Sequence, residues 1–164
     1  MKHIALIFIL ILSYSCETNS QNNSQNKVDY EVVVPNLNIP WGFTFLPDNS
    51  ILITEKEGEL IHFINGQKKI ISGLPEVTLR GQGGLMDIEL HPNFKENNLI
   101  YFTYASSDGA ESGANTTLMS AEFTGDKLTN KKVLYKAEPN SKKGEHFGSR
   151  IVFDKENHVY FSVG

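Results

Sequence analysis

The stretch WGFTFLPDNSILITEKEGELIHFINGQKKIIS, residues 41–72, decides the fold. Its apolar residues recur with a period near two, and no part keeps helical spacing over three turns, which indicates β-strands. Turn sequences separate the apolar runs at residues 47–50 (PDNS), 57–58 (EG) and 65–66 (NG), and Asn-Gly is a strong signal for a type I′ hairpin. The expected strands are residues 41–46, 51–54, 60–64 and 69–72. Four strands joined by tight turns form an antiparallel meander.

The same order of strands and turns recurs twice along the chain. The expected strands are residues 85–90, 99–104, 116–123 and 132–135 in a second unit, and 149–153 and 158–163 in a third. Gly42, Gly84 and Gly148 each enter the first strand of a unit, which predicts that they hold equivalent positions. Repeated four-stranded meanders of about 40–50 residues are typical of β-propeller blades, although a sandwich or an open barrel has the same alternation.

The chain has room for only about two and a half such blades. So short a piece leaves open sheet edges and uncovered faces, whereas propellers of about four to eight blades close into a ring. We therefore expect an all-β fold over residues 28–164 that is the N-terminal part of a larger propeller domain. We also expect this fragment to be inactive alone.

Composition and charge narrow the class of protein further. Of 164 residues, 40% are hydrophobic and 21% are charged, which is typical of a globular protein and not of a disordered one. The formal net charge is −4, and the basic residues are scattered along the chain. Nucleic acid is excluded as an expected partner because its affinity rests on neutralising phosphates with clustered cations.

Residues 1–16 are predicted to be an export signal. A short basic start precedes the apolar run Ile4–Leu12, and small residues lead from it to Cys16. This end resembles the lipobox of bacterial lipoproteins, in which the Cys thiol is acylated; simple cleavage to a soluble periplasmic protein is the alternative. Residues 17–27, rich in Asn, Gln and Ser, are predicted to be a flexible tether. The expected location is the periplasm or, as a lipoprotein, the outer membrane or cell surface of a bacterium. The protein is expected to contact the membrane through a lipid anchor only.

Two connections between the predicted blades carry polar residues at matching places. They are residues 73–83 and 136–147, and each leads back from an outer strand to the first strand of the next blade. Gln82 lies two residues before Gly84, and His146 lies two before Gly148. Because such connections emerge on one face of a propeller near its axis, both side chains are predicted to point into the same mouth of the central channel.

Several motifs in this order resemble one family. The motifs are PWG at 40–42, FLPD at 45–48, RGQGGLMD at 80–87, HPNF at 91–94 and EHFGSR at 145–150. Together they resemble the soluble quinoprotein aldose sugar dehydrogenases of the glucose/sorbosone dehydrogenase family. The resemblance runs from about residue 30 to 164, but it covers only the first third to half of the family's domain.

The resemblance implies a six-bladed propeller of four-stranded antiparallel blades that binds pyrroloquinoline quinone (PQQ) with calcium and oxidises aldose sugars at C1. His146 is then the general base that takes the proton of the anomeric hydroxyl while hydride passes to the quinone. His146 and Gln82 are the implied cofactor-binding residues in this segment. Glu145 stands where glucose-oxidising members have Asp, and it would orient His146 or raise its basicity. A separate electron acceptor is implied as well.

Several polar residues of the segment are open to a structural interpretation instead of a functional one. No dense carboxylate run of calcium-site type occurs in the sequence, so no metal ligand is expected in this segment. The main ligands of PQQ and calcium are expected beyond Gly164. Arg80, Arg150 and Asp87 are interpreted as structural. A lone His or Gln in a loop is also more often structural than catalytic. The alternative function is a noncatalytic β-propeller that binds a glycan or a protein at the cell surface.

Overall fold

Two four-stranded sheets and a hairpin follow one another along the chain in a computed structural model that describes residues 28–164. The predicted signal at residues 1–16 and the predicted tether at 17–27 lie outside the described residues. Within the described part, Val32–Gly164 form one unit. No helix of residues 28–164 is long and apolar enough to cross a membrane.

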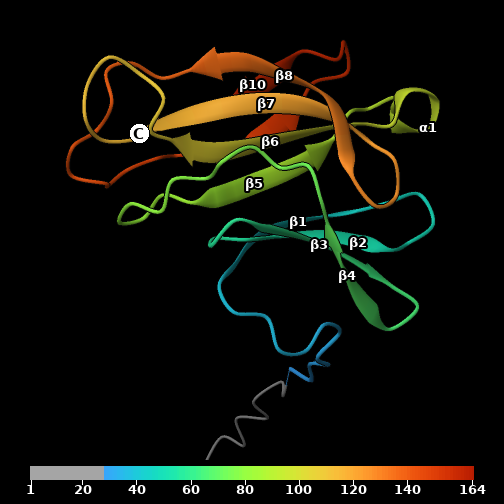
Figure 1. Ribbon diagram of the computed structural model, residues 1–164. Helices are drawn as coiled ribbons and strands as arrows, with labels where there is room; N and C mark the ends of the chain where they lie inside the picture. The colour runs from blue at the N-terminus through green and yellow to red at the C-terminus, as the bar shows by residue number, and fades with distance from the viewer. Residues whose placement is uncertain (1–27) are drawn as a thin grey trace, which may run out of the picture. The chain divides into compact units, whose positions relative to one another are not determined.

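The first sheet is the predicted meander, with neighbouring strands antiparallel in the order β1-β2-β3-β4 (Figure 1). Its strands are β1 (Pro40–Phe45), β2 (Ile51–Glu55), β3 (Glu59–Ile64) and β4 (Gln67–Ile71). The turn between β3 and β4 has φ values of 51° at Asn65 and 74° at Gly66. Positive φ at both central residues is what a type I′ turn requires, so Asn-Gly sets this hairpin as expected.

The second sheet repeats the arrangement in the order β5-β6-β7-β8. Its strands are β5 (Leu85–Leu90), β6 (Leu99–Ser106), β7 (Asn115–Phe123) and β8 (Leu128–Lys136). A single helical turn, α1 (Phe94–Asn97), interrupts the connection between β5 and β6. It ends at Asn98, whose φ of 53° lies in the left-handed region that Asn tolerates. The sequence predicted only a turn there.

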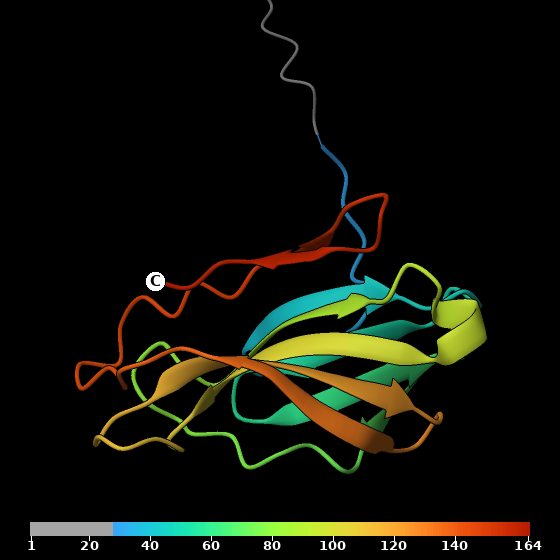
Figure 2. The ribbon, with the colours of Figure 1, turned by 90° about the horizontal axis from the view of Figure 1, so that it is seen from above.

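The third unit begins with the antiparallel hairpin of β9 (Ile151–Phe153) and β10 (Val159–Phe161). The first strands of the three units lie side by side, because β1 contacts β5 and β5 contacts β9. Figure 2 shows the same order, with β9–β10 in red along the first strands of both sheets. The indole Nε1–H of Trp41 reaches across to Ser149 Oγ at 3.3 Å. First strands that converge in this way are those of neighbouring propeller blades, and the predicted fold is confirmed as a partial propeller.

The core lies between the two four-stranded sheets. Leu52 and Leu60 from the first sheet meet Leu85, Ile88 and Phe102 from the second, and all five are at most 1% exposed. Each such side chain contributes about 1.5–3 kcal/mol through removal of its apolar surface from water. The two blades are therefore held together mainly by this shared apolar layer.

A threonine on the second strand of each blade ties that blade to the next. Thr54 Oγ1 accepts the N–H of Gly42 at 2.9 Å and donates to the carbonyl of Met86 at 2.5 Å. In the second blade, Thr103 Oγ1 accepts the N–H of Asp87 at 3.1 Å and donates to the carbonyl of Ser149 at 3.1 Å. Gly42 and Asp87 therefore occupy equivalent positions.

The predicted equivalence of the three glycines is wrong. The carbonyl of Gly84 accepts the N–H of Ala105 at 2.8 Å, just as the carbonyl of Ile39 accepts that of Lys56 at 2.9 Å, so Gly84 corresponds to Ile39. Gly84 has a different requirement, because a Cβ there would lie 2.1 Å from the carbonyl oxygen of Lys56. It permits close contact between blades instead of marking a repeat.

The outer face of the first sheet is apolar and open. Phe43 and Phe45 of β1 are 62% and 58% exposed, and they alternate with the buried Gly42 and Thr44. They line a cavity of about 540 Å³ whose remaining walls are also mostly apolar. This face lies opposite the one that packs on the second sheet, where a closed propeller has another blade.

Candidate functional site

The two predicted blade connections meet at one place. The main-chain N–H of His146 donates to Gln82 Oε1 at 2.9 Å, although 64 residues separate them in the chain. Both residues are exposed. The structure thus joins the two predicted connections through the Gln82 side chain and the main chain of His146, and a common mouth for the two side chains stays a prediction.

The connection that carries Gln82 is also bound through its main chain. The Gln82 N–H donates to the carbonyl of Gly144 at 2.8 Å. A Cβ at Gly81 would lie 2.2 Å from that same carbonyl oxygen, so only glycine permits this approach. The Arg80 guanidinium binds the carbonyl of Lys142, and Lys56 Nζ donates to the carbonyl of Gly81 at 2.6 Å. Residues 80–82 and 142–146 therefore form one bonded pair of loops.

His146 lies between anchored neighbours. Phe147 is 4% exposed, and its carbonyl accepts the hydroxyl of Thr116 at 2.6 Å. On the other side, Gly144 is bound by Gln82. His146 itself has a φ of 58°, which is uncommon for a residue with a side chain. A small cavity of about 40 Å³ lies beside it, with Glu145 among its lining residues.

Glu145 is exposed beside His146 but does not bind it. Among the hydrogen bonds and ion pairs within residues 28–164, none joins the Glu145 carboxylate to the His146 imidazole. Its predicted orienting role stays a prediction, since the bond that would carry it is not formed here.

Asp87 serves packing between blades. Its side chain is 3% exposed, and its Oδ2 accepts the N–H of Ile151 at 2.7 Å. Its Oδ1 lies 3.2 Å from Nη1 of Arg150, whose side chain is 73% exposed. Since Ile151 begins β9, Asp87 fastens the second blade to the third. This contact supports the structural interpretation of both Asp87 and Arg150.

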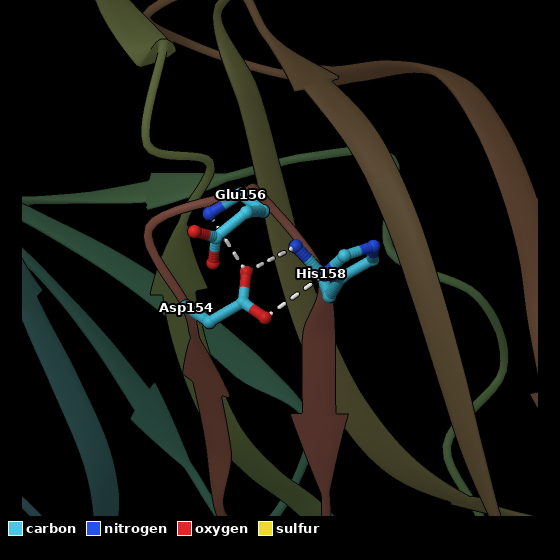
Figure 3. Close-up of side chains that lie close together, drawn as sticks. All are labelled: Asp154, Glu156 and His158. Carbon is cyan, nitrogen blue, oxygen red and sulfur yellow. Dashed lines mark hydrogen bonds and ion pairs between the residues drawn. The ribbon is translucent and has the colours of Figure 1, made fainter.

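A cluster that the sequence analysis did not single out lies at the turn between β9 and β10 (Figure 3). It consists of Asp154, Glu156 and His158, whose ligand atoms lie within 4.8 Å of one another. Asp154 Oδ1 accepts the main-chain N–H groups of Glu156 at 3.0 Å and His158 at 2.8 Å. Asp154 Oδ2 lies 2.9 Å from His158 Nδ1 and accepts the Tyr160 hydroxyl at 3.2 Å. These four contacts account for the cluster as a capped turn.

The fold and the joined loops define a class of protein: part of a β-propeller in which the side chain of Gln82 in one blade connection binds the main chain of His146 in the next. The model of the family described as Glucose / Sorbosone dehydrogenase matches residues 37–164. The chain therefore belongs to the glucose/sorbosone dehydrogenase family, and the predicted resemblance is confirmed.

Similar proteins agree with this assignment. Aldose sugar dehydrogenase YliI of Escherichia coli (strain K12) is 36% identical over 142 residues, which cover 84% of this chain and 38% of that protein. Quinoprotein glucose dehydrogenase B of Acinetobacter calcoaceticus is 30% identical over 147 residues, covering 83% of this chain and 30% of that protein. The apo-form structure of the soluble aldose sugar dehydrogenase of Escherichia coli has a TM-score of 0.77 at 34% identity, covering 82% of this chain and 40% of that one. The chain thus spans well under half the length of these relatives.

Proposed function

We propose that the complete protein is a PQQ-dependent dehydrogenase that oxidises aldose sugars at C1. The observation that carries the proposal is that His146 is exposed and that its main-chain N–H is bound to Gln82 Oε1, at the meeting of two blade connections. Family membership supports the reaction class, and one relative is a quinoprotein glucose dehydrogenase.

His146 would act as the general base. Imidazole changes its charge near neutral pH, so it can accept the proton of the anomeric hydroxyl and release it afterwards. The exposure of His146 leaves it accessible to a sugar, and its N–H and the carbonyls of Gly144 and Phe147 on either side of it are hydrogen-bonded. A base fixed in this way holds its geometry during proton transfer.

The described residues fit one edge of a PQQ site. Gln82 Nε2 has no hydrogen-bond partner within residues 28–164, so it offers two N–H donors beside His146 to an acceptor-rich quinone. Bound PQQ would supply the hydride acceptor, a role that no side chain can fill. Arg80 and Arg150 already donate to protein oxygens, and we propose that the cofactor's carboxylates are bound mainly by residues after Gly164.

Calcium does not fit the described residues. The Asp154 cluster has both carboxylate oxygens engaged by four donors, and His158 offers nitrogen where calcium prefers oxygen ligands. We propose that calcium, if the complete protein binds it, has its ligands after Gly164.

We further propose that the protein is exported and anchored through an acylated Cys16, and that it passes electrons to a separate acceptor. The motif at the end of the predicted signal supports the anchor. Labelling of cells with a radioactive or clickable fatty acid should mark the wild type and not Cys16→Ala. Equal labelling of both would contradict the anchor.

The isolated chain is proposed to be inactive. It spans 38% of the Escherichia coli relative, and the open face around Phe43 and Phe45 lacks the blade that a closed ring places there. A ring that is not closed cannot enclose a substrate near its axis.

The decisive experiment uses the complete protein with PQQ and calcium, aldoses as donors and an artificial dye as acceptor. We expect dye reduction in the wild type and a loss of kcat of at least about 100-fold in His146→Gln, since a general base contributes about 10²–10⁴-fold. His158→Gln, in the turn between β9 and β10, is the matched control and should retain activity. Unchanged turnover in His146→Gln would contradict the assignment of the base. Failure of the wild type to bind PQQ in a titration would favour the noncatalytic binding propeller.

A further inference from the structure

The main-chain conformation of His146 needs an external support. Its φ of 58° costs about 1–2 kcal/mol for a residue with a side chain, and such conformations persist where surrounding contacts impose them. Within residues 28–164 the bond on its N–H comes from a side chain of the preceding blade connection, Gln82 Oε1 at 2.9 Å.

Gln82 is itself fixed well enough to act as that support. Its own N–H donates to the carbonyl of Gly144 at 2.8 Å, so it binds the His146 segment at two points, two residues apart. The loop before it is held by Lys56 Nζ on the carbonyl of Gly81 and by Arg80 on the carbonyl of Lys142. The acceptor atom, Gln82 Oε1, thus belongs to a loop whose main chain is held by several hydrogen bonds.

The identity of the donor decides the orientation of the Gln82 amide. A main-chain N–H can only donate, so the atom facing it must be the oxygen Oε1 and not the NH₂ group. Any substitution that keeps an oxygen at this place keeps the bond, whereas one that removes it leaves the His146 N–H without its partner.

We propose that Gln82 is a positioning residue that holds His146 in its left-handed conformation through the bond from the His146 N–H to Gln82 Oε1. This role rests on the proposed function for its consequence in turnover, but the bond itself does not. It acts through His146 and is separate from any contact that the Gln82 amide makes with a cofactor or a sugar.

The test compares two substitutions in the complete protein labelled with ¹⁵N-histidine. Gln82→Glu keeps an oxygen acceptor of nearly the same shape, and Gln82→Met keeps the length without an acceptor. The His146 amide signal is assigned by its loss in His146→Gln. We expect Gln82→Met to accelerate hydrogen exchange of this amide by about tenfold and Gln82→Glu to preserve its protection. Gln67→Met, at the start of β4 and exposed, is the control and should leave it unchanged.

Turnover supplies the second readout. Gln82→Met should lower kcat with little change in KM, because a displaced base affects the chemical step more than sugar binding. A fall in kcat without faster exchange of the His146 amide would overturn the positioning role and assign Gln82 to direct contact with substrate or cofactor. Unprotected exchange of the His146 amide in the wild type would overturn it without any variant, even where Gln82→Met fails to fold. If the wild type does not reduce the dye, only the proposed function is contradicted. Hydrogen exchange of the His146 amide still tests the bond from the His146 N–H to Gln82 Oε1.

Discussion

Thr54 provides the sharpest test of how the blades are joined. Its hydroxyl lies in a fully buried position, accepts the N–H of Gly42 and donates to the carbonyl of Met86 in the next blade. Thr54→Val keeps the shape of the side chain and removes only the hydroxyl. The change therefore isolates the two hydrogen bonds from the surrounding packing.

The expected loss follows from the two main-chain groups left without this partner. A buried donor or acceptor that loses its partner costs about 1–3 kcal/mol, so two of them should lower the free energy of unfolding by about 2–6 kcal/mol. Thr103→Val should lower the free energy of unfolding by a similar amount, because Thr103 is equally buried and makes the equivalent pair of bonds to Asp87 and Ser149.

Urea denaturation of the complete protein, followed by tryptophan fluorescence and circular dichroism, measures these losses. Thr129→Val on β8 is the matched control, because Thr129 is half-buried and makes no side-chain hydrogen bond within the described residues. The free energy of unfolding of this variant should stay within about 0.5 kcal/mol of the wild type. A Thr54→Val variant as stable as the wild type would refute the reasoning. So would a control that loses as much as Thr54→Val.

Three further changes test other contacts. Gly42→Ala should lower the free energy of unfolding by about 1–3 kcal/mol, and with it the urea midpoint, because its Cβ would lie 2.8 Å from Asp87 Oδ1. An unchanged midpoint would show that β1 and β5 can move apart without cost. Burial lowers the pKa of His62 below its ordinary 6.5, so the unfolded chain binds more protons, and the free energy of unfolding should fall as the pH drops below about 6.5. His62→Gln should flatten this part of the plot of stability against pH. An identical slope in the variant would contradict the assignment of this pH dependence to His62. Burial raises the pKa of Glu89 above its ordinary 4.5, so the free energy of unfolding should decline as the pH rises above about 4.5. Glu89→Gln should therefore raise the urea midpoint at pH 7 but not at pH 4. An equal effect at both pH values would point to a cause other than the charge of Glu89.

Local sequence was enough for most of the strands. Alternation and turn chemistry act over a few neighbouring residues, and Asn65-Gly66 adopts the two positive φ values that its hairpin needs. The helical turn Phe94–Asn97 escaped prediction because four residues are too few to show a helical period. The family, too, was recognisable from motifs, since those motifs are local.

What the sequence by itself determined is the class of fold, the approximate strands and the family. It also predicted that the connections carrying Gln82 and His146 meet, but from an equivalence of glycines that the structure contradicts. Only the tertiary structure decided which residues are equivalent between blades, because Gly42 and Asp87 are matched by hydrogen bonds and not by residue type. It also decided that Gln82 binds the main chain of His146 and that Glu145 does not bind its ring. These hydrogen bonds join residues 12, 16 and 64 positions apart, and their geometry is set by how strands and whole blades pack, which no local pattern records.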